Sequence, residues 1–204
     1  MNIEFDATTH TYRHNGRVLP SVTQVLRAVI PQFQADKWYL DKGTAMHACA
    51  AFIAKGKRFN LTPETEALIG GRVHACRKWF ADFKPEVLAV EEMVADENLL
   101  SVGTPDLECV LDLPKYGVCR VVVDWKSTIT PVCQWQLGGY AKASKHKPKF
   151  GMPVELREDG TYRVGVGKDG KLYNMDVAGR EWAVFRSAYG MMEREKLLEK
   201  GEAA

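Results

Sequence analysis

The sequence predicts an α+β domain. Helix start signals and helical spacing of apolar residues dominate between residues 21 and 80, whereas beyond residue 86 apolar side chains recur in short segments rich in β-branched residues. The length of 204 residues fits a single domain. From residue 62 onward the expected elements follow in the order α-β-β-β-α-β, and further strands and a helix come after them.

The first sixty residues are expected to form a hairpin and two helices. Asn15-Gly16 is a strong turn signal for the hairpin. Ser21 is a suitable N-cap for the helix that follows, because its hydroxyl can accept from an unpaired backbone N–H of the first turn. The expected ranges are 1–20 for the hairpin, 22–29 for the first helix and 43–52 for the second.

The remaining elements begin with a long helix. Thr62-Pro63-Glu64 supplies a capping hydroxyl, a proline at the first helical position and an acid in the first turn. This helix should end near Phe80. The expected strands are 87–94, 105–113 and 117–125, followed by a helix over 131–144, a hairpin over 153–173 and a last helix from about 177. The last helix has an apolar stripe of Trp182, Phe185, Tyr189 and Met192.

Composition excludes several classes of protein. No apolar segment approaches the ~18 residues of a membrane span, and the N-terminus has no signal-peptide core, so we expect a cytoplasmic chain without a membrane partner. Five cysteines without any C-x-x-C pair argue against a disulfide framework, a zinc site or an iron–sulfur cluster. We expect one domain over 1–204, with an N-terminal part (1–60), a core (61–158) and a C-terminal extension (159–204).

The charge balance excludes a protein that coats nucleic acid by bulk electrostatics, because the net charge is only +2. Basic residues nevertheless gather in three clusters: Lys55, Lys57 and Arg58; Arg72, Arg77 and Lys78; and Lys142, Lys145, Lys147 and Lys149. Each cluster alone is more typical of a solvated face than of a phosphate track. The clusters would indicate a path for nucleic acid only if an active site lies between them.

Two of the expected strands carry an acidic face. A turn centred near Lys115 places Asp106 opposite Asp124, with Glu108 and Lys126 on the same face. Directly opposed carboxylates have Cβ atoms about 5 Å apart and repel each other, so a divalent cation with oxygen ligands would compensate them. Spacing alone leaves the alternative of a surface charge cluster open. The other face is apolar and is expected to be core: Leu107, Cys109, Leu111, Val121, Val123 and Trp125.

Four motifs follow one another between about residues 10 and 145. A Gly43–His47 segment of the G-x-x-x-H type comes first, and then Pro105-Asp106. Asp124-Trp125-Lys126 and a Q-x-x-x-Y segment, Gln136–Tyr140, complete the set. Together they resemble the PD-(D/E)XK nuclease superfamily in its RecB-type and phage-exonuclease branch. The resemblance implies a restriction-endonuclease-like αβββαβ core, a mixed sheet flanked by helices, with the N-terminal hairpin and helices and the C-terminal hairpin and helix as additions.

The resemblance also implies a metal centre for Mg²⁺, with Mn²⁺ as a substitute. Asp106, Asp124, the carbonyl of Trp125 and His47 would hold the metal. The metal would activate a water molecule and stabilise charge on the scissile phosphate. Lys126 would orient or deprotonate that water. No iron–sulfur cluster is expected, because the cysteine quartet of cluster-bearing relatives is missing from the sequence.

Further catalytic residues follow from the same resemblance. Glu91 would add an acid from the preceding strand, with Glu92 as the alternative because strand register cannot be read to within one residue. Gln136 and Tyr140 are four residues apart on one helical face and would lie at the substrate. Ser127 would contact a phosphate.

The function that the resemblance implies is a Mg²⁺-dependent DNA exonuclease of phage origin, acting in recombination or DNA processing in a bacterial host. A homo-oligomer or a recombination partner protein would fit this role. An endonuclease of the same superfamily and a catalytically silent DNA-binding module stay open as alternatives. The complete acid–acid–lysine set argues against the silent module, because a binding protein needs no carboxylates facing phosphates. A Mg²⁺ enzyme acting on nucleotides would need a glycine-rich phosphate loop, which the sequence lacks.

Overall fold

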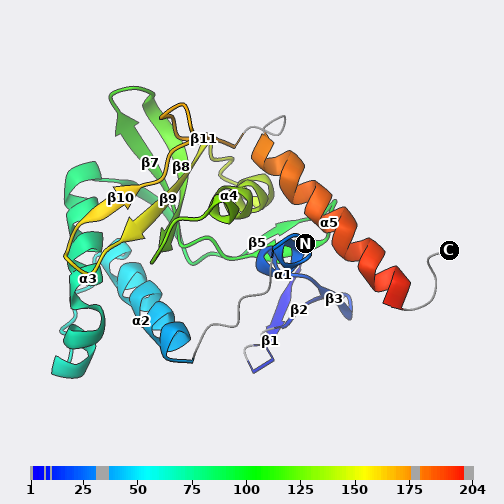
Figure 1. The fold of residues 1–204 in the computed structure, drawn as a ribbon, viewed down its shortest axis with the longest axis horizontal. Helices are drawn as coiled ribbons and strands as arrows, with labels where there is room; N and C mark the ends of the chain where they lie inside the picture. The colour runs from blue at the N-terminus through cyan, green and yellow to red at the C-terminus, as the bar shows by residue number, and fades with distance from the viewer. Residues whose placement is uncertain (1, 7, 10, 31–36, 176–179, 200–204) are drawn as a thin grey trace.

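The fold is α+β, with a mixed sheet flanked by helices (Figure 1). The computed structural model describes residues 2–6, 8–9, 11–30, 37–175 and 180–199. The sheet has the strand order β10-β9-β8-β7-β4, and β11 also pairs with β9. Only β8 and β9 run parallel. The strands are β4 (Glu86–Val90), β7 (Leu107–Leu113), β8 (Gly117–Lys126), β9 (Phe150–Leu156), β10 (Tyr162–Val164) and β11 (Tyr173–Asn174).

Helices cover both faces of this sheet (Figure 1). On one face α2 (Lys37–Ala54) and α3 (Pro63–Phe83) pack against alternate strand residues, among them Val121 and Val123. On the other face α4 (Pro131–Ala143) and α5 (Arg180–Glu199) pack against Val122, which points the opposite way because side chains alternate along a strand. The predicted apolar face of the central hairpin is confirmed: Leu107, Cys109, Leu111, Val121, Val123 and Trp125 are all buried in the first core.

The local signals near the N-terminus are confirmed. Asn15 and Gly16, with φ of 50° and 76°, form the turn between β2 (Thr11–His14) and β3 (Arg17–Leu19). Both residues need a positive φ in a tight hairpin turn, which explains the Asn-Gly pair. β1 (Glu4–Asp6) adds a third strand. Ser21 caps α1 (Val22–Arg27) in a reciprocal capping box with Gln24.

Helix starts follow their caps, but α2 and α3 are both longer than predicted. Thr62 accepts from the Thr65 N–H and begins α3 at Pro63, and α3 ends at Phe83. α2 extends beyond the predicted range 43–52 and runs from Lys37 to Ala54. The predicted apolar stripe of α5 packs against the core: Phe185 and Met192 are buried, and Trp182 and Tyr189 are half-buried. Among the described residues no helix is both long and apolar enough to cross a bilayer.

The strand predicted over 87–94 is confirmed only in its first half. β4 ends at Val90, because Glu91 has the left-handed φ of 52° and its N–H donates across the chain to the carbonyl of Asp106 at 3.3 Å. Val94 instead begins a separate hairpin of β5 (Val94–Asp96) and β6 (Ser101–Gly103). The second predicted strand starts two residues late, at Leu107.

The hairpin predicted over 153–173 is confirmed as the antiparallel pair of β9 and β10, with its turn at Asp159-Gly160, but it belongs to the main sheet. Its first part belongs to β9, which starts at Phe150 and lies inside the sheet, parallel to β8. Gly151 and Pro153 interrupt the β-branched pattern, which is why the segment was not predicted as an interior strand. β10 pairs with one end of β9 and β11 with the other, so the 153–173 segment closes the edge of the sheet rather than standing apart.

Two helical glycines give opposite predictions for stability. A Cβ at Gly71 in α3 would lie 1.8 Å from the carbonyl oxygen of Glu158, whereas a Cβ at Gly43 in α2 would meet nothing within 4 Å. We expect Gly71→Ala to lower the free energy of unfolding by about 2 kcal/mol or more. Gly43→Ala should raise it by about 0.5–1 kcal/mol, because alanine favours the helix. Urea unfolding measures both, and a shift of both variants in the same direction would contradict this packing.

Candidate active site

The central hairpin brings two carboxylates together. β7 and β8 pair from Leu113 opposite Gly117 to Leu107 opposite Val123, which is the register that the sequence predicts. The next residues along are Asp106 and Asp124, and both are buried. The Asp106 Oδ2 accepts a hydrogen bond from the Trp125 N–H at 2.7 Å, which anchors one side of this carboxylate. Its other oxygen, Oδ1, faces α2.

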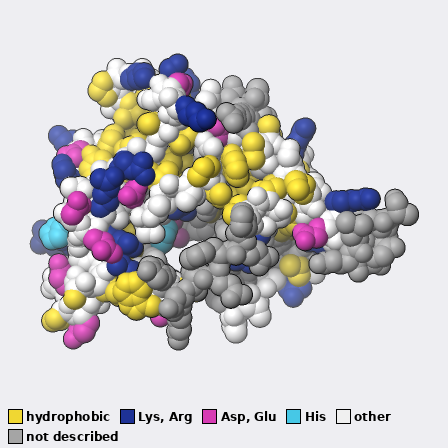
Figure 2. All heavy atoms as spheres, in the orientation of Figure 1, with side chains coloured by type: hydrophobic (Ala, Val, Ile, Leu, Met, Phe, Trp, Pro, Cys, Tyr) yellow, Lys and Arg dark blue, Asp and Glu magenta, His cyan; other side chains and the backbone are white. Residues whose placement is uncertain are grey.

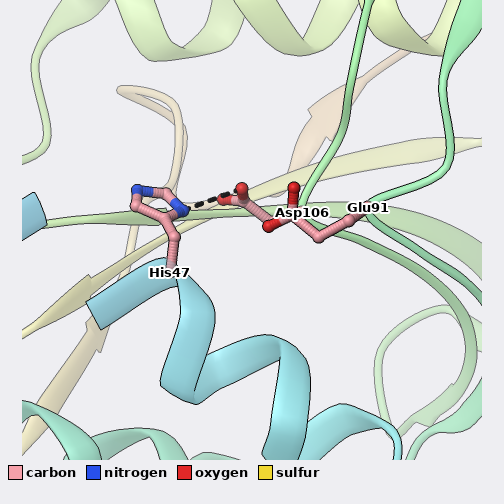
Figure 3. A group of neighbouring side chains, drawn as sticks. All are labelled: His47, Glu91 and Asp106. Carbon is pink, nitrogen blue, oxygen red and sulfur yellow. Dashed lines mark hydrogen bonds and ion pairs between the residues drawn. The ribbon is translucent and has the colours of Figure 1, made fainter. Parts of the chain in front are cut away.

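Two further side chains of the kind that bind metals lie beside Asp106 (Figure 3). His47 from α2 places Nδ1 2.9 Å from the Asp106 Oδ1. Glu91, at the left-handed turn after β4, completes a group in which one ligand atom from each side chain lies within 4.8 Å of the other two. Glu92 instead forms an ion pair with Lys145. Of the two acids left open by the sequence, Glu91 is therefore the one beside Asp106.

A second chain of contacts starts at Asp124. The Lys126 Nζ lies 2.6 Å from the Asp124 Oδ2 and donates to the Gln136 Oε1 at 3.1 Å. The Gln136 Nε2 in turn donates to the Tyr140 hydroxyl at 2.7 Å. Gln136 and Tyr140 share one face of α4, as predicted, and this face lies against the sheet. Gln136 therefore fixes the position of the Lys126 ammonium group, and Tyr140 fixes the position of the Gln136 side chain.

The sequence predicts that something must compensate the opposed carboxylates, and that a divalent cation would do so. In the structure each carboxylate also has a partner from the chain: Lys126 beside Asp124 and His47 beside Asp106. Both carboxylates are therefore paired with a basic side chain within the folded chain. An ion that binds both carboxylates has to compete with Lys126 for Asp124.

The predicted metal ligands are brought together only in part. His47 and Asp106 are in contact, and Asp124 follows Val123 on the neighbouring strand. Trp125 was predicted to bind the metal through its carbonyl, but the contact that it makes with this group is a hydrogen bond from its backbone N–H to Asp106. The Trp125 side chain is buried in the core. Ser127 follows β8 and is exposed. Glu91, predicted as a catalytic acid, lies in the group with ligand geometry.

The electrostatic environment raises several pKa values. Burial raises the pKa of Asp124 to about 6, although Lys126 acts against this shift. Loss of solvent and then the charge of Asp106 raise the pKa of Glu91 to about 7. For His47 and Lys126 burial acts to lower the pKa, but the neighbouring carboxylates outweigh it and the pKa of both groups is raised. Lysine therefore stays charged at neutral pH.

We expect the pH dependence of stability to reveal this environment. The folded chain holds the proton of Glu91 up to about pH 7, whereas an unfolded glutamate releases it near pH 4.3. Between these values the folded state binds more protons, so ionisation lowers the free energy of unfolding as pH rises. Glu91→Gln should match wild type at low pH and become the more stable protein by about pH 8, without metal. Urea midpoints measure this, and a constant difference between the two proteins would contradict the raised pKa.

The donor set suits a divalent ion. Carboxylate oxygens are the ligands that Mg²⁺ prefers, and an added imidazole nitrogen suits Mn²⁺ as well. Opposite ligands of an octahedral Mg²⁺ site lie about 4.2 Å apart, twice the usual ligand distance. The 4.8 Å limit that contains His47, Glu91 and Asp106 is only slightly larger. These three residues therefore form a candidate site for a divalent ion.

Comparison with known proteins does not assign the chain to a family. No protein-family model matches the chain, and no curated protein matches its sequence. The interpretation of this site therefore depends on its own residues and their geometry.

Proposed function

We propose that the chain is a Mg²⁺-dependent DNA nuclease of the PD-(D/E)XK type, built on a restriction-endonuclease-like core. The observation that carries this proposal is the position of Asp106 and Asp124 next to the last residue pair of one hairpin, with Lys126 in contact with Asp124 and His47 in contact with Asp106. Buried acids beside a charged lysine suit phosphodiester hydrolysis, where negative charge develops close to a metal. The sheet flanked by helices is compatible with this core.

Asp106 and Asp124 would hold the ion, with His47 and Glu91 completing its ligands. Such an ion supplies Lewis acidity to the phosphate and lowers the pKa of a bound water. Lys126 stays protonated because the acids raise its pKa, so it acts as a hydrogen-bond donor and a positive charge rather than as a base. Gln136 keeps the ammonium group in place, and Tyr140 keeps Gln136 in place.

We further propose that the enzyme acts on DNA ends, as an exonuclease that serves recombination or DNA processing. A groove of about 550 Å³ opens beside His47 and Glu91 along α2, and Gly43, Ala48 and Ala51 are among the residues that line it. These small residues leave room for one end of a strand next to the acids. A fraying end enters such a groove at less cost than an internal site, where each base step holds about 1.4 kcal/mol of stacking.

The test compares three substrates at equal nucleotide concentration: end-labelled linear duplex, single strand and covalently closed plasmid. With Mg²⁺ the label should be released from linear DNA while the plasmid stays closed, and EDTA should stop release. Rapid nicking of the plasmid would replace the exonuclease with an endonuclease. DNA binding without cleavage in Mg²⁺ or Mn²⁺ would overturn the nuclease proposal in favour of a silent binding module.

A further inference from the structure

A row of charged side chains continues from the active site across the sheet. Lys126 of β8 pairs in register with Glu155 of β9, and Glu155 pairs with Arg163 of β10. Residues that are partners in neighbouring strands project from the same face of a sheet. Glu155 and Arg163 therefore lie on the face that carries Asp124 and Lys126. Neighbouring strands are about 4.8 Å apart, so Arg163 stands about 10 Å from Lys126 along this row.

Two arginines share the one carboxylate in this row. The Nε and Nη2 of Arg163 donate to the Glu155 Oε2 at 3.0 and 2.5 Å. The Nε of Arg157 donates to the Oε1 at 3.3 Å. Both carboxylate oxygens are thus used, and the three side chains together keep one net positive charge. Figure 2 shows basic side chains gathered over β9 and β10 on the visible face, with acidic side chains beside them.

A second carboxylate with two basic partners, Glu158, serves as a comparison because its partners are little exposed and connect elements of the fold. Glu158 also holds two cations, Lys42 at 2.5 Å and Arg72 at 3.3 Å, but these two side chains are only 7% and 14% exposed. That cluster fastens α2 and α3 to the turn after β9. In contrast, Arg157 and Arg163 are 42% and 50% exposed, whereas their Glu155 is 15% exposed. The arginine cations are held in place and still open to solvent.

Because exposed ion pairs contribute little to stability, stability does not explain why Glu155 holds two exposed arginines. A guanidinium group fits a phosphate with two parallel hydrogen bonds, and fixing it beforehand reduces the entropy lost on binding. Phosphates follow one another at every nucleotide of a strand, so a strand that runs along this row carries phosphates near both Lys126 and the arginines about 10 Å away. A strand whose scissile phosphate lies at Lys126 would therefore bring another phosphate to the arginines.

We propose that Arg157 and Arg163, held by Glu155, form a phosphate-binding subsite for the DNA strand that enters the active site. The inference rests on the proposed nuclease function and adds to it a fixed second contact on the same strand. Arg157 and Arg163 act in binding and positioning, since they lie too far from Asp124 to reach the reacting atoms. Glu155 acts through the arginines.

The test measures binding of the whole chain to a fluorescent single strand and to its duplex in EDTA, where a metal-dependent nuclease does not cut. Arg163→Gln should weaken binding about tenfold, and the double variant with Arg157→Gln should weaken it further. The slope of log affinity against log salt should fall by about 0.7–0.9 for each arginine lost. Arg163→Lys should recover part of the affinity. Lys115→Gln, which removes an exposed charge in the turn at the far end of the hairpin, is the matched control and should bind as wild type does.

The outcomes separate this subsite from the function on which it rests. If wild type cleaves DNA and binds it in EDTA, but the arginine variants keep wild-type affinity and salt slope, the subsite is wrong and the nuclease stands. A lower melting temperature with unchanged affinity would assign the arginines a purely structural role and overturn the subsite equally. If wild type neither cleaves nor binds any DNA, the nuclease proposal fails and the subsite fails with it.

Discussion

Asp106→Asn is expected to reduce Mg²⁺-dependent DNA cleavage by at least about a hundredfold. The carboxylate lies at the centre of the candidate site, in contact with His47 on one side and the Trp125 N–H on the other. An amide keeps an oxygen for the Trp125 N–H but carries no charge for an ion, and loss of a metal ligand or of its orientation typically costs 10–100-fold or more. Release of label from linear duplex measures the loss.

The fold of this variant should survive. Removing one of several close negative charges relieves repulsion, and the retained hydrogen bond keeps the change in the free energy of unfolding within about 1 kcal/mol. Asp112→Asn is the matched control, because Asp112 lies on the same strand but is exposed near the turn. The control should cleave as wild type does. Retention of more than a few per cent of activity by Asp106→Asn would remove Asp106 from the active site.

Lys126→Ala should reduce cleavage about as much as Asp106→Asn does, while metal binding persists. Lysine is only a donor and cannot bind a metal while charged. Its removal also frees the Asp124 carboxylate, so Mn²⁺ should bind the variant at least as tightly as wild type in a calorimetric titration at neutral pH. The metal-free variant should unfold more easily, by about 1–3 kcal/mol, because the buried Asp124 loses its ion-pair partner.

The sequence offers a matched control for this lysine. Asp169-Gly170-Lys171 repeats the Asp-x-Lys spacing in an exposed turn, where the Lys171 Nζ lies 3.7 Å from Asp169. Lys171→Ala should leave cleavage and stability unchanged, since exposed pairs contribute little. Normal cleavage by Lys126→Ala, or equal losses in the two variants, would show that the catalytic lysine is misidentified.

The parts of the fold that depend on local chemistry were predictable. A capping hydroxyl marks the start of α1 and of α3, and the Asn15-Gly16 pair marks the first turn. The register of β7 and β8 followed from one wholly apolar face, since a slip by one residue would turn that face to the opposite side. These signals lie within a few residues of the structure that they specify.

The missed features depend on contacts between distant segments. β4 ends at Val90 because Glu91 turns to meet Asp106, fifteen residues later, and no local signal marks that turn. The parallel pairing of β8 with β9 is not readable from alternation, so the row from Lys126 to Arg163 was not predicted. The ion pair of Lys126 with Asp124 was missed for a different reason. The two residues were placed on one face, but the lysine was assigned to the water molecule and to the charge of the transition state, not to Asp124.

The most direct test of a metal-dependent active site in this chain is to locate Mn²⁺ by anomalous diffraction in crystals of the whole protein. We expect density about 2.0–2.3 Å from a carboxylate oxygen of Asp106, with Asp124 and either His47 or Glu91 as further ligands. Lys126 should then have moved away from Asp124. Mn²⁺ bound only elsewhere, in a protein that cleaves DNA with Mn²⁺, would contradict this active site.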